Sequence, residues 1–216
     1  MSDTNKGSKI VTGVLWRFGE KVTAQMVSFM VSIVLARLLL PNDYGIVAIV
    51  NIFISVAEVF VTSGLGTALI QKKDADETDF STVFWCNIAL SICLYGIVFV
   101  LSPLIASFYN IPSLTAVLRV FSLRLPISAI NSIQNAYVSR KMDFKKFFFA
   151  TLIGTIISAI VGIAMAYKGF GVWALVAQYL TNSTIDTMAL FVIVNWRPQL
   201  KFSLKRARPL VSYGWK

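Results

Sequence analysis

The sequence predicts an all-α membrane protein in which six transmembrane helices form one bundle. The chain is 56% hydrophobic, above the roughly 45–50% apolar share of soluble domains. Its apolar residues gather into six long stretches, at about residues 10–40, 46–70, 80–108, 114–138, 147–167 and 172–196. Each has at least about 20 residues, enough for a helix to cross a hydrocarbon core about 30 Å thick.

Residues that break or end helices separate these stretches. Pro41–Gly45 closes the first, the segment 109–113 closes the third, and Lys168–Gly171 forms a turn before the sixth. Pro126 interrupts the fourth. We therefore expect residues 1–196 to form the bundle, and residues 197–216 to form a basic cytoplasmic or interfacial segment that leads toward a seventh helix.

Basic residues predict the orientation. The net charge is +10, and under the six-span prediction one side of the membrane carries most of the loop cations. That side holds fourteen: Lys6, Lys9, Lys72, Lys73, Arg140, Lys141, Lys145, Lys146, Arg197, Lys201, Lys205, Arg206, Arg208 and Lys216. The opposite side holds Lys168, with Arg37 near its boundary. The positive-inside rule then places both ends of this chain in the cytoplasm.

Composition and motifs exclude several other functions. The chain has no histidine, which excludes imidazole metal sites and histidine general bases. Cys86 and Cys93 lie two helical turns apart, too far for a disulfide. No phosphate-binding loop of the G-x-x-x-x-G-K-[ST] form occurs. We expect no enzyme activity, no catalytic residues, no metal and no cofactor, and the basic loops indicate orientation rather than nucleic-acid binding.

Polar residues inside the stretches follow helical spacing, so each set lies on one face of its helix. Four stretches carry such a stripe, which predicts a shared polar interior: Arg17, Lys21, Gln25, Ser28 and Ser32; Asn51, Ser55, Glu58 and Thr62; Arg124, Ser128, Asn131 and Asn135; Gln178, Asn182 and Asp186. The fifth stretch instead carries small residues on one side, which favours close helix packing: Thr151, Gly154, Thr155, Ser158 and Gly162.

Five cations lie within the stretches: Arg17, Lys21, Arg37, Arg119 and Arg124. A charge at the centre of a membrane helix costs roughly 2.5–3.5 kcal/mol on insertion scales, so such a residue usually serves a function. We predict that these cations, with Gln25 and Asn131, bind an anionic cargo. Glu58 and Asp186 are candidates for coupling transport to a proton or sodium gradient.

Each of these predictions has a structural alternative. Glu58 could pair with Arg124 as a bridge between helices, and Arg37 and Arg119 could extend to the outer lipid headgroups. Trp16, Trp85, Trp173 and Trp196 fall near stretch ends, where interfacial anchors are expected.

Several segments together resemble one known family. They are residues 36–45 (ARLLLPNDYG), 64–66 (GLG), 141–145 (KMDFK), 169–176 (GFGVWALV), 196–198 (WRP), 202–204 (FSL) and 208–210 (RPL). Their order and spacing resemble bacterial polysaccharide flippases of the Wzx type, within the multidrug/oligosaccharidyl-lipid/polysaccharide exporter superfamily. Leu40 departs from the pattern, because the family typically has a small residue there.

The resemblance implies a fold of two six-helix lobes around a central cavity, of which this chain matches the N-terminal lobe. It implies transport of an undecaprenyl-pyrophosphate-linked oligosaccharide across the bacterial cytoplasmic membrane by alternating access. The implied partners are that lipid-linked sugar, membrane lipids, a C-terminal half and glycan polymerase or ligase machinery. A multidrug exporter of the same superfamily and a non-transporting scaffold of a glycan-synthesis complex remain alternatives.

Overall fold

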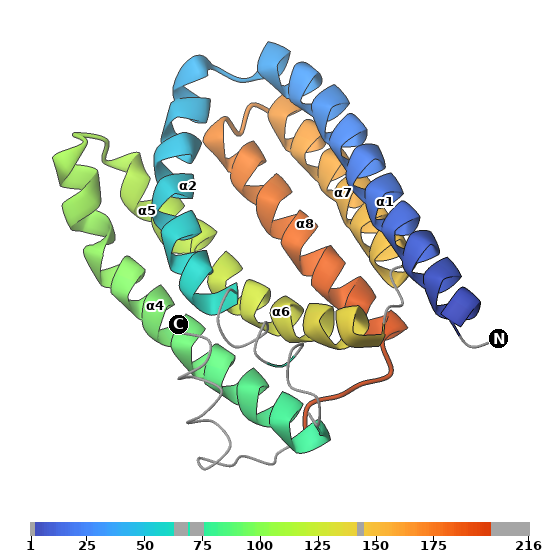
Figure 1. Ribbon diagram of the computed structural model, residues 1–216. Helices are drawn as coiled ribbons and strands as arrows, with labels where there is room; N and C mark the ends of the chain where they lie inside the picture. The colour runs from blue at the N-terminus through green and yellow to red at the C-terminus, as the bar shows by residue number, and fades with distance from the viewer. Residues whose placement is uncertain (1–2, 63–68, 70–75, 142–144, 200–216) are drawn as a thin grey trace.

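The protein is a bundle of long helices (Figure 1). A computed structural model describes residues 3–62, 69, 76–141 and 145–199. Within them the elements are α-helices: α1 (Asp3–Leu38), α2 (Pro41–Thr62), α4 (Glu77–Phe108), α5 (Ser113–Phe121), α6 (Arg124–Lys141), α7 (Lys145–Tyr167) and α8 (Val172–Ile193). In the second stretch, residues 63–68 and 70 lie outside the described residues. In the basic segment, residues 200–216 do.

The helices are arranged as a series of neighbours. α1 packs along α7, and α7 packs along α8. α8 meets α6 and α2, while α4 lies against α5 and α6 on the far side of the bundle from α1 (Figure 1). Glycines allow the close contact of α7 with α8: a Cβ on Gly162 would lie 3.0 Å from Gln178 Cβ, and one on Gly154 would lie 3.2 Å from the Asn182 carbonyl oxygen. The small-residue face predicted for the fifth stretch is therefore confirmed.

Five segments are long and apolar enough to span a membrane: residues 21–38, 41–62, 77–108, 113–140 and 147–167. Many of their large apolar side chains are exposed, among them Val100, Leu104 and Phe108 of α4. Such a surface suits hydrocarbon rather than water. The chain is therefore an all-α, multi-pass membrane protein. α8 does not meet the same criterion in the described residues, and a sixth span there remains a prediction.

The fourth stretch forms two helices, α5 and α6, rather than one. Pro126 has no N–H to donate to the Ser122 carbonyl four residues earlier, and its ring would clash with that group. The Leu125 N–H donates to the Ser122 carbonyl instead, at 2.9 Å. The helix consequently breaks at Ser122 and Leu123, one turn before the proline that the sequence identified.

The buried apolar side chains form two separate clusters. The first joins the α1–α2 and α7–α8 turns to α5, and Leu35, Leu118 and Leu175 belong to it. The second joins the start of α4 to the ends of α6 and α8, and includes Phe84 and Ile133. Polar stripe residues of α6 and α8 instead line a cavity: Arg124, Ser128, Asn131, Asn135, Asn182 and Asp186.

The chain after α8 returns to the start of α4. Gln199 bonds to three α4 residues: its N–H donates to Ser81 Oγ at 3.0 Å, its carbonyl accepts from Trp85 Nε1 at 3.0 Å, and its amide donates to Glu77 at 2.9 Å. Trp196 is 4% exposed and packs against the rings of Phe80, Phe84 and Tyr137. The expectation that Trp196 is an interfacial anchor is wrong, because this ring fills the second core.

Candidate functional site

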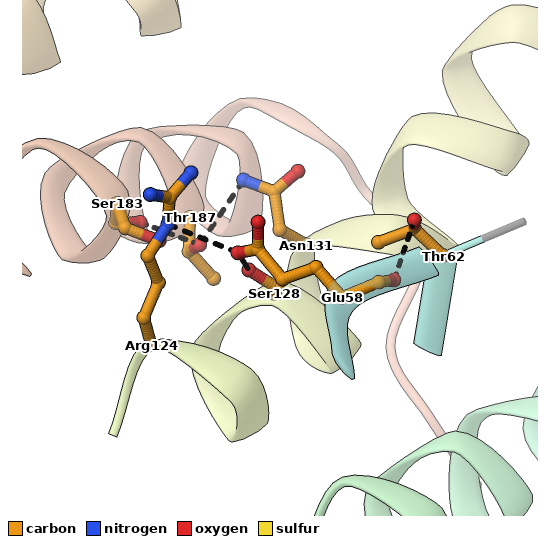
Figure 2. Close-up of polar contacts among 7 residues, drawn as sticks. All are labelled: Glu58, Thr62, Arg124, Ser128, Asn131, Ser183 and Thr187. Carbon is orange, nitrogen blue, oxygen red and sulfur yellow. Dashed lines mark hydrogen bonds and ion pairs between the residues drawn. The ribbon is translucent and has the colours of Figure 1, made fainter. Parts of the chain in front are cut away.

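An ion pair joins α2 to α6 in the middle of the bundle. Arg124 Nε lies 3.0 Å from Glu58 Oε1, and both side chains are about three-quarters or more buried. Ser128 Oγ donates to the same carboxylate oxygen at 2.9 Å (Figure 2). Arg124 begins α6, directly after the break at Ser122 and Leu123. The pairing of Glu58 with Arg124 as a bridge between helices, the structural alternative for Glu58, is thus observed.

A hydrogen-bond network around Asp186 joins α6, α7 and α8. The Asn131 amide donates to Asp186 Oδ2 at 2.8 Å and to Thr187 Oγ1 at 3.1 Å. Thr151 donates to Asp186 Oδ1 at 3.4 Å. The Asn135 amide donates to Asn131 Oδ1. Neutral donors from α6 and α7 thus contribute hydrogen bonds to the Asp186 carboxylate.

Two cavities lie beside these polar contacts. The first, of about 400 Å³, lies between α6 and α8; it is lined by Thr62, Arg124, Ser128, Asn131, Ser132, Asn135, Ala136, Ser139, Tyr179, Asn182, Ser183 and Asp186. The second, of about 500 Å³, lies between α1 and α7–α8, and Gln25, Ser28, Ser32, Tyr44 and Gln178 are among its lining residues. Arg124, Tyr179 and Asn182 line both, so the two cavities meet at these three side chains.

The structure brings only part of the predicted site together. Arg124, Asn131 and Asp186 line the first cavity, Gln25 lines the second, and Glu58 reaches the first through Arg124. Lys21 and Arg37 are exposed on α1 and line neither cavity. The Arg17 side chain lies outside the described residues. The predicted anion-binding role of these cations stays a prediction.

Arg119 occupies a different environment from the cavities, on the side of α5 that faces α4. Pro103 removes the N–H that would bond to the Phe99 carbonyl in α4. Ser102 Oγ donates to that carbonyl at 2.8 Å, and Arg119 Nε donates to Ser102 Oγ at 3.0 Å and to the carbonyl at 3.4 Å. The guanidinium also lies 4.2 Å from the Phe99 ring centroid. Its observed contacts stabilise a proline-interrupted helix.

Tyr179 is one of the polar or aromatic cavity residues that sequence reasoning missed, together with Tyr44, Ser132, Ser139 and Ser183. An aromatic residue in an apolar stretch is ordinary, so its chemistry gave no signal. Its spacing did: Tyr179, Asn182 and Asp186 are three and four residues apart, on the same face as the stripe. For metals, the described part of the chain holds no group of three or more Cys, Asp or Glu side chains that could bind an ion.

Comparisons with known proteins agree with the earlier resemblance. Residues 34–216 match the family described as Polysaccharide biosynthesis protein. The chain is 25% identical, over 100% of its length, to 44% of the succinoglycan biosynthesis transport protein ExoT of Rhizobium meliloti (strain 1021). It is 26% identical over 95% of its length to 42% of the lipopolysaccharide biosynthesis protein WzxC of Escherichia coli (strain K12).

A third relative is the teichuronic acid biosynthesis protein TuaB of Bacillus subtilis (strain 168), at 26% identity over 73% of this chain and 33% of TuaB. The chain thus spans less than half the length of the curated relatives it matches. No solved structure matches it. Because the family match covers most of the sequence, this chain belongs to the polysaccharide biosynthesis protein family.

Proposed function

We propose that this chain is one half of a flippase that moves a lipid-linked oligosaccharide, carried on undecaprenyl pyrophosphate, across the bacterial cytoplasmic membrane. The observation that carries the proposal is the pair of cavities of about 400 and 500 Å³, whose walls carry polar stripe residues and which meet at Arg124, Tyr179 and Asn182. A membrane protein that had only a structural role would have no need for polar cavities among its apolar helices. Family membership supports a polysaccharide cargo.

The transport step needs no covalent chemistry. Amides and hydroxyls can exchange hydrogen bonds with sugar hydroxyls, cations on α1 can meet the diphosphate, and the polyprenyl tail can remain in hydrocarbon. Alternating access would come from movement of this bundle against a second one. The Asp186 network and the Glu58–Arg124 pair are the groups through which a proton or sodium gradient could drive that movement.

A second bundle is part of the proposal, because the relatives are more than twice as long as their matched segments. The test is complementation of a flippase-deficient strain. Residues 1–216 alone should not restore glycan export, whereas co-expression with the C-terminal half of a relative should restore it. Restoration by a demonstrably monomeric 1–216 would refute the half-transporter proposal. Failure of the assembled pair, with both halves inserted, would refute flipping itself.

Orientation is tested separately, with both termini of this chain proposed to be cytoplasmic. Single cysteines at positions 75, 110, 142 and 169 are introduced into a chain that lacks Cys86 and Cys93. A membrane-impermeant thiol reagent applied from outside should label 110 and 169 only. Labelling at 75 or 142 would contradict the proposed orientation or the proposed number of spans.

A further inference from the structure

The first cavity has the wrong charge for a diphosphate. Arg124 is the only cation among the described residues that line either cavity, and Glu58 already pairs with it at 3.0 Å. Asp186 adds a carboxylate to the wall of the first cavity. A polyanion entering this space would meet an Arg124 that is already paired with Glu58. The carboxylate of Asp186 would repel it, and at low dielectric such repulsion is strong.

The remaining lining chemistry is hydroxyl and amide. Ser128, Ser132, Ser139 and Ser183 contribute hydroxyls, and three asparagines contribute amides. Such groups both donate and accept, as sugar hydroxyls do. The volume of about 400 Å³ falls within the roughly 300–1,000 Å³ of small-molecule pockets.

Tyr179 supplies a flat surface where the two cavities meet. Its side chain is 39% exposed although it lies on a polar face in the interior of the bundle. Phe121 packs against the ring at 5.5 Å between centroids in an edge-to-face arrangement, and the Arg124 guanidinium carbon lies 5.9 Å from its centroid. The ring is thus held by neighbours while part of its surface stays open to the cavities.

We propose that the first cavity is a binding subsite for an uncharged sugar unit, which stacks on Tyr179 and bonds to Asn182 and the serine hydroxyls. This proposal rests on the proposed function and assigns the neutral glycan portion of the cargo to this site. The axial C–H groups of a pyranose ring give it an apolar face that fits an aromatic ring. The diphosphate then binds elsewhere, and the exposed Lys21, one turn from the cavity residue Gln25, is nearest in sequence.

The test is direct binding to the full 216-residue chain in lipid nanodiscs. The probes are maltotriose, a neutral trisaccharide, and inorganic pyrophosphate, measured by saturation-transfer-difference NMR titration. Maltotriose should bind, Tyr179→Ala should weaken it about tenfold, and Tyr179→Phe should retain most of the affinity. Tyr167→Ala is the matched control, because Tyr167 is exposed at the end of α7 and lines neither cavity.

Ser132→Phe is a second variant that does not touch Tyr179; its ring would occupy the cavity and abolish maltotriose binding. Absence of maltotriose binding to the wild type, equal binding by Tyr179→Ala, or competition by pyrophosphate would each overturn the subsite. The result is separable from transport. Sugar binding without export by the assembled halves would refute the flippase and keep the subsite. Export that tolerates Tyr179→Ala, with no maltotriose binding, would refute the subsite alone.

Discussion

Arg119 and Arg124 lie in the same apolar stretch, and the sequence assigns them the same anion-binding role, yet they occupy opposite sides of the helix break. Arg119, on α5, supports the proline-interrupted part of α4 through Phe99 and Ser102. Arg124, on α6, pairs with Glu58 and lines both cavities. Two cations of one apolar stretch can therefore have different surroundings, a cavity wall or the backbone beside a proline, and their places in the sequence do not distinguish the two.

The largest effect is expected at Arg124. Arg124→Ala removes the cation that pairs with the partly buried Glu58 carboxylate and leaves it the bond from Ser128, which costs about 1–3 kcal/mol or more for a charged group. We expect glycan export by the assembled halves to be lost while the chain still inserts. Export is measured by surface glycan and insertion by membrane immunoblot. Normal export at a normal protein level would show that transport does not require Arg124.

A double substitution separates the two roles of Arg124. Glu58→Gln with Arg124→Gln removes both charges and keeps two groups that can hydrogen-bond across the α2–α6 contact. Replacing both members of a buried pair is often close to neutral for stability, whereas removing one is not. If Arg124 acts as a bridge, the double variant should recover a substantial part of the export that Arg124→Ala loses. Export as low as in the single variant would instead indicate direct contact with the cargo.

Arg119→Ala is expected to have a smaller effect, on stability rather than transport. It removes hydrogen bonds worth about 1 kcal/mol each and a cation–π contact worth about 0.5–2 kcal/mol. The midpoint of thermal unfolding in detergent should fall by a few degrees, with most export retained. Pro103→Ala in the same chain should restore part of the loss, because residue 103 then donates an N–H to the Phe99 carbonyl. Loss of export with unchanged thermal stability would place Arg119 in the cargo path.

The comparison also shows why the sequence predicted one part of the site and not another. The stripes on α2, α6 and α8 could be predicted because helical periodicity alone decides which residues share a face. The partner of Glu58 depends on how α2 and α6 are rotated relative to each other, and no local pattern records that. The role of Arg119 depends on a carbonyl of another helix that Pro103 leaves without its usual donor.

In the fold, too, the sequence predicts some features and not others. Apolar length predicts the long helices, and the small residues Gly154 and Gly162 predict close helix packing, which the structure shows to be against α8. The sequence predicts that Pro126 interrupts the helix. The break itself lies four residues earlier, at Ser122, whose carbonyl the proline obstructs. Trp196 could not be placed from sequence, because its burial requires the chain after α8 to return to α4.

Lysine substitutions should give the smallest effects and still distinguish the two arginines. Arg124→Lys keeps the charge beside Glu58 but loses the planar group that meets the carboxylate and lies near Tyr179, so we expect partial export. Arg119→Lys keeps a donor for the Phe99 carbonyl and a cation near its ring, so export and thermal stability should stay close to wild type. Both variants are measured in the same export and unfolding assays. Equal losses in the two variants would mean that the different contacts of Arg119 and Arg124 do not give them different roles.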